Sequence, residues 1–249
     1  MAGFKTHITT SSLLGIAYGG AAYWQYDVPL AACVLAGGLC SVSGMLPDLD
    51  SDSSVPLRES VAFAAAVVPM LMIDRFQQLG WPNESIVLAG GLIYLVVRFG
   101  IAGIFKRYTV HRGMWHSLPA AMIAGLLTFL IICDAQLELR LYKSGAVVLG
   151  FLSHLVLDEM YSLQWQGGRW RLKRSFGTAL KLWSRRSLWA NISTYGKLIL
   201  LVALAVGDPL LMDYFGYGEQ HVPRTARNVL QDVLDQSDDA LSRGAKVLR

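Results

Sequence analysis

The chain has 249 residues, of which 53% are hydrophobic and only 16% carry a charged side chain. Soluble domains carry about 25% charged residues, so this composition excludes a disordered chain and a sustained coiled coil. The 3 cysteines are too few for a small disulfide scaffold. Two classes remain: a membrane protein with several spans, or a soluble helical bundle with an unusually apolar core.

The apolar residues are collected into runs that short clusters of charge separate. In chain order these runs are 8–26, 28–47, 60–73, 86–105, 113–133, 144–157 and 198–207. The longest cross a hydrocarbon core of about 30 Å, and the last run is the weakest. The sequence therefore predicts an all-α, polytopic transmembrane bundle of six to seven helices. The first run lacks the basic start of a cleavable signal peptide.

Counting the crossings assigns each loop to one of two faces. The residues before the first span and the loops after the second, fourth and sixth spans share the first face. The basic residues of the first face are Lys5, Arg58, Lys106, Arg107, Arg112, Arg169, Arg171, Lys173, Arg174, Lys181, Arg185 and Arg186. Those of the second face are Arg75, Arg140 and Lys143. Because positive residues mark the cytoplasmic side, we expect the first face to be cytoplasmic.

The region after the sixth span is basic and rich in tryptophan. No acidic residue occurs from Met160 to Gly207. Lys and Arg mixed with Trp suit the anionic headgroup layer of a bilayer. Nucleic acid would attract the same charges, but we expect a lipid bilayer and no nucleic acid as the partner. Residues 166–168 are predicted to turn a short hairpin.

The C-terminal residues 224–249 alternate acids, bases and aliphatic side chains. This pattern predicts a solvated amphipathic helix without chemistry of its own. We therefore divide the chain into a membrane-embedded domain, 1–215, and an amphipathic tail, 216–249. The side on which the tail lies depends on whether the seventh run crosses the membrane.

Four of the 5 histidines fall at the membrane boundary of the first face. They are His7, His111, His116 and His154. Ionisable groups near a membrane are costly and are therefore often functional. His154 and Asp158 are separated by one helical turn, a spacing that suits two metal ligands or an Asp that orients a ligating His. A simple hydrogen bond that closes the helix is the alternative.

His111 and His116 would point about 140° apart on an ideal helix, so they converge only if the chain turns between them. Gly113 favours such a turn. Ser117 is predicted to cap the next helix, with Pro119 in its first turn. Arg112 is a candidate clamp for an anionic phosphate, or one more cytoplasmic basic residue.

Three alternating carboxylates follow the second apolar run, at Asp48, Asp50 and Asp52. Such carboxylates repel one another unless a cation or water screens them, and histidines nearby make Zn²⁺ or Mn²⁺ plausible. The spacing also imitates an EF-hand loop. Ser53 stands where that loop requires Gly and Pro56 interrupts it, so a solvated loop is the stronger alternative.

The topology gathers these side chains at one face as candidate metal ligands. The predicted ligands are His7, Asp48, Asp50, His111, His116, His154 and Asp158. Tetrahedral zinc uses four ligands, so the set holds two ions or includes residues that orient the ligands. Two ions would suit the hydrolysis of a phosphoester. Glu159 is a candidate base, although on a helix it points about 100° away from Asp158.

These motifs together resemble a known family. The matching residues are His7, Pro47–Asp50, His111–Ser117 and His154–Asp158. In order and spacing they resemble the YdjM-like family of bacterial inner-membrane, metal-dependent hydrolases, also described as LexA-regulated. The resemblance implies a multi-pass protein of the bacterial inner membrane with a divalent metal. It fades after Asp158, where residues 161–168 replace the Pro-rich turn of relatives.

We therefore expect a membrane hydrolase that cleaves a phosphoester of a lipid or lipid-linked substrate at the cytoplasmic interface. A transporter or metal carrier is the alternative, although transporters usually place their sites near the midplane. A non-catalytic membrane protein with a structural metal is a third hypothesis. The sequence contains no Gly-x-Ser-x-Gly segment and no Walker loop.

Overall fold

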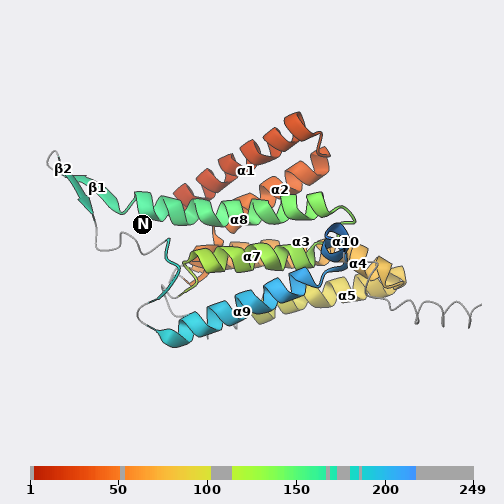
Figure 1. Cartoon of the computed structure of the whole chain (residues 1–249). Helices are drawn as coiled ribbons and strands as arrows, with labels where there is room; N and C mark the ends of the chain where they lie inside the picture. Colours follow the sequence, from red (N-terminus) through yellow and green to blue (C-terminus); the bar gives the residue numbers. More distant parts are fainter. Residues whose placement is uncertain are drawn as a thin grey trace, which may run out of the picture. The chain divides into compact units, whose positions relative to one another are not determined.

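A computed structural model of the chain describes residues 3–50, 54–101, 114–166, 169–172, 180–184 and 187–216. By their contacts, residues 1–205 form one compact unit and residues 206–249 a second. Among its described residues, the first unit is helical apart from one hairpin (Figure 1). Its elements are α1 (Phe4–Tyr26), α2 (Leu30–Ser43), the 3₁₀-helix η1 (Leu46–Asp50), α3 (Ser54–Leu71), α4 (Ile73–Gln78), α5 (Asn83–Leu95), the π-helical η2 (Val96–Ile101), α7 (Leu118–Ile131), α8 (Leu137–Met160), β1 (Leu163–Gln166), β2 (Arg169–Leu172) and α9 (Leu188–Val206). The second unit contains α10 (Pro209–Tyr214).

The predicted membrane bundle is confirmed. Within the described residues, 3 helical stretches are long and apolar enough to cross a membrane: Asn83–Gly100, Leu137–Met160 and Leu188–Val206. The spans expose apolar side chains; Leu88, for example, is 74% exposed. Such a surface suits lipid better than water. The weakest predicted run therefore belongs to a full-length helix, α9.

The other predicted spans differ in length or polarity. α2 and α7 are apolar but shorter than a full span. α1 has 23 residues but is less apolar, because Thr and Ser occupy positions 9–12. Pro69 lies near the end of α3, which stops at Leu71. The structure therefore combines full-length spans with shorter helices that pack against them.

Glycines allow α2 to approach two neighbouring helices closely. A methyl group on Gly15 of α1 would lie 2.5 Å from the carbonyl oxygen of Gly37 on α2. Gly150 of α8 lies still closer to the carbonyl of Cys40, again on α2. Small residues of this kind permit close backbone contact between membrane helices. They bring the start of α1, the end of α2 and the last turns of α8 together.

The start of α7 follows the predicted pattern. The Ser117 side chain accepts a hydrogen bond from the Ala120 N–H at 3.4 Å, and Pro119 lies in the first turn. The predicted N-cap is therefore confirmed. Further along, α7 packs on α8 around the buried side chains of Phe151 and Leu155.

The predicted hairpin is also confirmed. Strands β1 and β2 are antiparallel, and Trp165 pairs with Trp170. Residues 167–168, which connect the strands, lie outside the described residues, as does the predicted amphipathic helix 224–249. Between the hairpin and α9, the Asn191 amide binds the backbone of Ser184 through two hydrogen bonds of 2.8 Å.

An ion pair joins the α7–α8 loop to α8, at the opposite end of α8 from Asp158. Lys143 Nζ lies 2.8 Å from Asp134 Oδ2, and the Gln136 N–H donates to Asp134 Oδ1 at 3.2 Å. Burial alone would raise the pKa of Asp134. The two hydrogen bonds and the charges of Lys143 and Arg140 outweigh this effect, so the pKa of Asp134 lies below its usual value. The ionised carboxylate therefore favours the folded state.

We expect Asp134→Asn to lower the melting temperature in detergent near neutral pH. The loss corresponds to about 1 kcal/mol or less, because the pair is partly exposed. A lowered folded pKa stabilises the fold above the unfolded value of about 4, and this stabilisation disappears as the pH falls through the folded pKa. Wild type and variant should therefore melt alike once Asp134 is protonated. An equal difference at neutral and acid pH would contradict this origin, and Asp74→Asn on exposed α4 is the control.

Candidate metal centre

Five of the predicted ligands lie together at the end of α8 where that helix finishes. They come from four separate segments of the first compact unit: His7 from α1, Asp48 from η1, His116 from the turn before α7, and His154 and Asp158 from α8. Four of the five side chains are buried, and Asp48 is partly buried. The even number of crossings between these segments places them at one end, and close helix packing brings them into contact.

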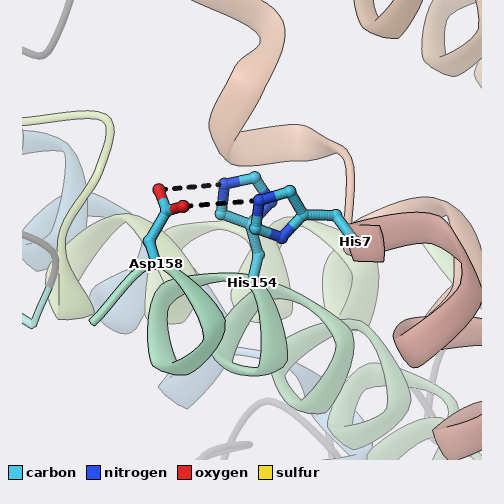
Figure 2. Close-up of side chains that lie close together, drawn as sticks. All are labelled: His7, His154 and Asp158. Atoms are coloured by element: carbon cyan, nitrogen blue, oxygen red, sulfur yellow. Dashed lines mark ion pairs between the residues drawn. The ribbon is translucent and has the colours of Figure 1, made fainter. Parts of the chain in front are cut away.

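The first group consists of His7, His154 and Asp158 (Figure 2). One carboxylate oxygen of Asp158 lies 3.4 Å from His7 Nε2, and the other lies 3.7 Å from His154 Nε2. The two imidazole rings stack, with centroids 3.6 Å apart and planes 13° from parallel. The predicted pairing of His154 with Asp158 across one helical turn therefore includes a third residue from α1.

The second group consists of Asp48, His116 and His154. Asp48 Oδ1 lies 3.6 Å from the Nε2 atoms of both histidines. In each group the candidate ligand atoms all lie within 4.8 Å of one another. His154 belongs to both groups, so it stands at the centre of the cluster.

The second ring nitrogen of His154 determines which atom faces the cluster. Nδ1 lies 2.7 Å from the carbonyl oxygen of Gly44. Because a carbonyl only accepts, Nδ1 donates, and the neutral ring then presents the lone pair of Nε2 to Asp48 and Asp158. A lone pair beside two carboxylates is repulsive unless a cation or a proton lies between them. A backbone carbonyl that orients a histidine in this way is common at metal sites.

The separations within the cluster fit shared ligation better than direct hydrogen bonds. Nitrogen and oxygen atoms about 2.1 Å from a tetrahedral ion lie about 3.4 Å from one another. The measured separations of 3.4–3.7 Å are close to this value, whereas N–H···O hydrogen bonds are typically about 2.7–3.2 Å long. His7 is only 2% exposed, and neither of its ring nitrogens has a hydrogen-bond partner among the described residues. The side chains therefore fit a divalent metal.

Backbone contacts hold the segments in place. The Trp115 indole N–H donates to the Leu46 carbonyl at 2.6 Å, which ties the turn carrying His116 to η1 and Asp48. The Ser11 hydroxyl donates to the Ser41 carbonyl at 2.8 Å, which ties α1 to the end of α2. Sequence reasoning missed these supporting residues. Trp115 offered a signal, because it lies beside His116 and carries a donor that needs a partner when buried.

The charge of Asp48 is favoured by its neighbours. Burial alone would raise the pKa of this carboxyl, but the contact with His116 and the interactions with the His154 and His7 rings outweigh that effect and lower the pKa to below its usual value. Asp48 therefore stays ionised near neutral pH and is available to a cation.

The remaining predicted site residues are not part of this cluster. His111 and Arg112 lie outside the described residues, and so does the side chain of Asp50. Glu159 follows Asp158 on α8 and belongs to neither group of candidate ligands. Successive helical residues are about 100° apart, so Glu159 occupies a different face of α8 from Asp158.

Comparison with known protein families gives a match over most of the chain. The family model described as the YdjM inner membrane protein matches residues 1–208. This region includes both groups of candidate ligands. No curated protein and no solved structure matches the chain.

Proposed function

The chain belongs to the YdjM inner membrane protein family. We propose that it is an integral-membrane, metal-dependent hydrolase. The protein is a multi-pass protein of the inner membrane, and it contains residue groups that could hold a metal. The proposed substrate is a phosphoester of a lipid or a lipid-linked molecule. The observation that carries the proposal is the ligand-like spacing of buried His and Asp side chains at one end of the helices.

In this proposal His154 is the central ligand, and His7, Asp48, His116 and Asp158 complete the site. Imidazole and carboxylate ligands favour Zn²⁺ or Mn²⁺. When bound, such a cation acts as a Lewis acid on a phosphoryl oxygen and acidifies water. Asp48 and Asp158 balance its charge, and the Gly44 carbonyl holds the His154 ring in position.

The shared histidine limits how many ions the described residues can hold. Nδ1 of His154 is occupied by the Gly44 carbonyl, so only Nε2 is available, and one nitrogen binds one ion. The two groups therefore cannot each hold an ion of their own, but together they can surround a single ion. A second ion would need other ligands, and Asp50 and His111 are the candidates from the sequence.

Two further roles are proposed from the sequence alone. Arg112 is placed between two predicted ligands in the chain, where a guanidinium suits the clamping of a phosphate. Glu159 remains the proposed base beside Asp158. If Glu159 takes the proton from water, a Glu159→Gln variant should keep the metal and lose turnover.

The position of the cluster supports a lipid substrate. His7 lies in the first turns of α1 and Asp158 in the last turn of α8, which has 24 residues and is long enough to cross the membrane. Both residues therefore lie near an end of the span rather than at its midplane, where a phosphate headgroup would be. A transporter, the second candidate, would place its site near the midplane.

The test is turnover by purified protein loaded with Zn²⁺ or Mn²⁺ in lipid nanodiscs. We expect release of phosphate or a headgroup from phosphatidic acid, phosphatidylglycerol or a polyprenyl phosphate, and a loss of at least about 100-fold in His116→Ala. Identical activity in wild type and His116→Ala would contradict the proposal. Metal without any turnover would favour a structural metal, and metal uptake into sealed vesicles would favour a transporter.

A further inference from the structure

An apolar groove runs between α1 and α8, beside the candidate metal centre. Its volume is about 330 Å³, and we call it the α1–α8 groove. Its walls include the apolar side chains of Leu14, Leu152, Val156 and Met160 and the polar side chains of Thr10 and Ser153. The residues from α8 recur at helical spacing, so one stripe of that helix forms a continuous wall.

The groove and the metal centre are built on neighbouring residues of the same two helices. Thr10 lies one turn after His7 on α1, and Ser153 directly precedes His154 on α8. Figure 2 shows the rings of His7 and His154 lying against each other beside Asp158. The helices that form the groove therefore also carry the first group of candidate ligands.

The groove opens towards the surface of a membrane span. Val156 is 44% exposed and Met160 is 59% exposed, and both belong to α8, which is apolar and long enough to cross the membrane. Its volume of about 330 Å³ is many times the roughly 30 Å³ of one water molecule, so the groove has room for a segment of a lipid chain.

We propose that the α1–α8 groove holds one acyl chain of the substrate phospholipid and so brings its phosphate to His7, His154 and Asp158. This inference rests on the proposed function for the reaction at the phosphate. A chain gains little hydrophobic free energy by leaving lipid for an apolar groove, because both surroundings are apolar. The groove therefore contributes by orienting the phosphoester, and orientation accelerates a reaction by making it effectively unimolecular.

Photo-cross-linking tests this directly. The probe is phosphatidylglycerol with a diazirine in one acyl chain, incorporated into nanodiscs with the full-length protein. We expect the diazirine to label residues of the groove in the wild type. Val156→Trp fills the groove from α8 and should reduce this labelling several-fold. Leu14→Trp, on the opposite wall, should have the same effect and provides an independent variant.

Matched controls place the same side chain on lipid-facing positions outside the groove. Leu13→Trp lies beside Leu14 on α1, where Leu13 is 63% exposed, and Leu141→Trp lies on α8, where Leu141 is 51% exposed. Both controls should be labelled as strongly in the groove as the wild type. Metal content is measured in every variant and should stay unchanged, which shows that the centre has folded.

The outcomes separate this inference from the proposed function. Equal labelling of the groove in Val156→Trp, Leu14→Trp and both controls would overturn the inference, even if metal binding and turnover persist. Absent labelling of the wild-type groove would also overturn it and would indicate an occupant other than a lipid chain. Specific labelling without metal or turnover would support the groove as a lipid site and would contradict the proposed hydrolysis.

Discussion

Purified His154→Ala is expected to lose the metal that the wild type retains in stoichiometric amount. The variant removes the one nitrogen that faces both carboxylates and also leaves the Gly44 carbonyl without its donor. Removing a residue that only orients a ligand typically costs 10- to 100-fold in metal affinity, so removing a ligand should cost about 100-fold or more. Elemental analysis of protein purified in detergent measures the effect, with Zn and Mn determined together.

Asp48→Ala should also lose the metal, because its carboxylate lies beside two of the histidines. Asp74→Asn on α4 removes an exposed carboxylate of the same chain and should retain the full amount. A wild type without stoichiometric metal would contradict the metal centre and leave a network of buried His and Asp. Retention of metal in both His154→Ala and Asp48→Ala would also contradict it.

The second large effect is expected from Gly150→Val on α8. Any side chain at this position would overlap the Cys40 carbonyl and the Ser43 hydroxyl on α2. Overpacking typically costs about 1–3 kcal/mol, and backbone atoms on one side make relief difficult here. The end of α2 leads into Gly44, which orients His154, so separation of α2 from α8 should weaken the metal centre as well.

The melting temperature and the metal content should therefore both fall in Gly150→Val. The matched control is Gly91→Val on α5, where an added methyl group meets nothing within 4 Å. Both variants introduce the same side chain into a glycine position of an apolar helix, so the difference between them reports helix contact alone. Similar melting temperatures for the two variants would contradict the role given to the α2–α8 contact.

The order of the membrane helices was predictable because it depends on composition and local periodicity. Apolar runs mark the spans, Ser117 marks the start of α7, and Gly167 and Gly168 mark the turn of a hairpin. The weak run at 198–207 was underestimated because α9 extends back to Leu188, where Asn191 and Tyr195 are polar side chains. Both side chains donate hydrogen bonds to backbone carbonyls of the preceding segment. A mean hydropathy value counts them as polar and does not reflect that these groups have partners.

The candidate centre was predictable only in part. His154 and Asp158 are one helical turn apart, so their proximity follows from the helix itself. The parity of the crossings placed His7, Asp48 and His116 at the same end as that pair, but parity does not bring side chains into contact. Whether Arg112, His111 and Asp50 join them stays a prediction.

Hydropathy and helical spacing act over a few neighbouring residues, so they are enough to predict a multi-pass helical membrane protein with histidines and carboxylates at one boundary. The packing of distant helices was needed to show that His154 belongs to two groups of candidate ligands, that the Gly44 carbonyl orients it, and that a groove lies between α1 and α8 nearby. These features depend on backbone carbonyls and on close contact between distant helices. Every residue carries the same carbonyl, so no residue type marks in advance which one will be used.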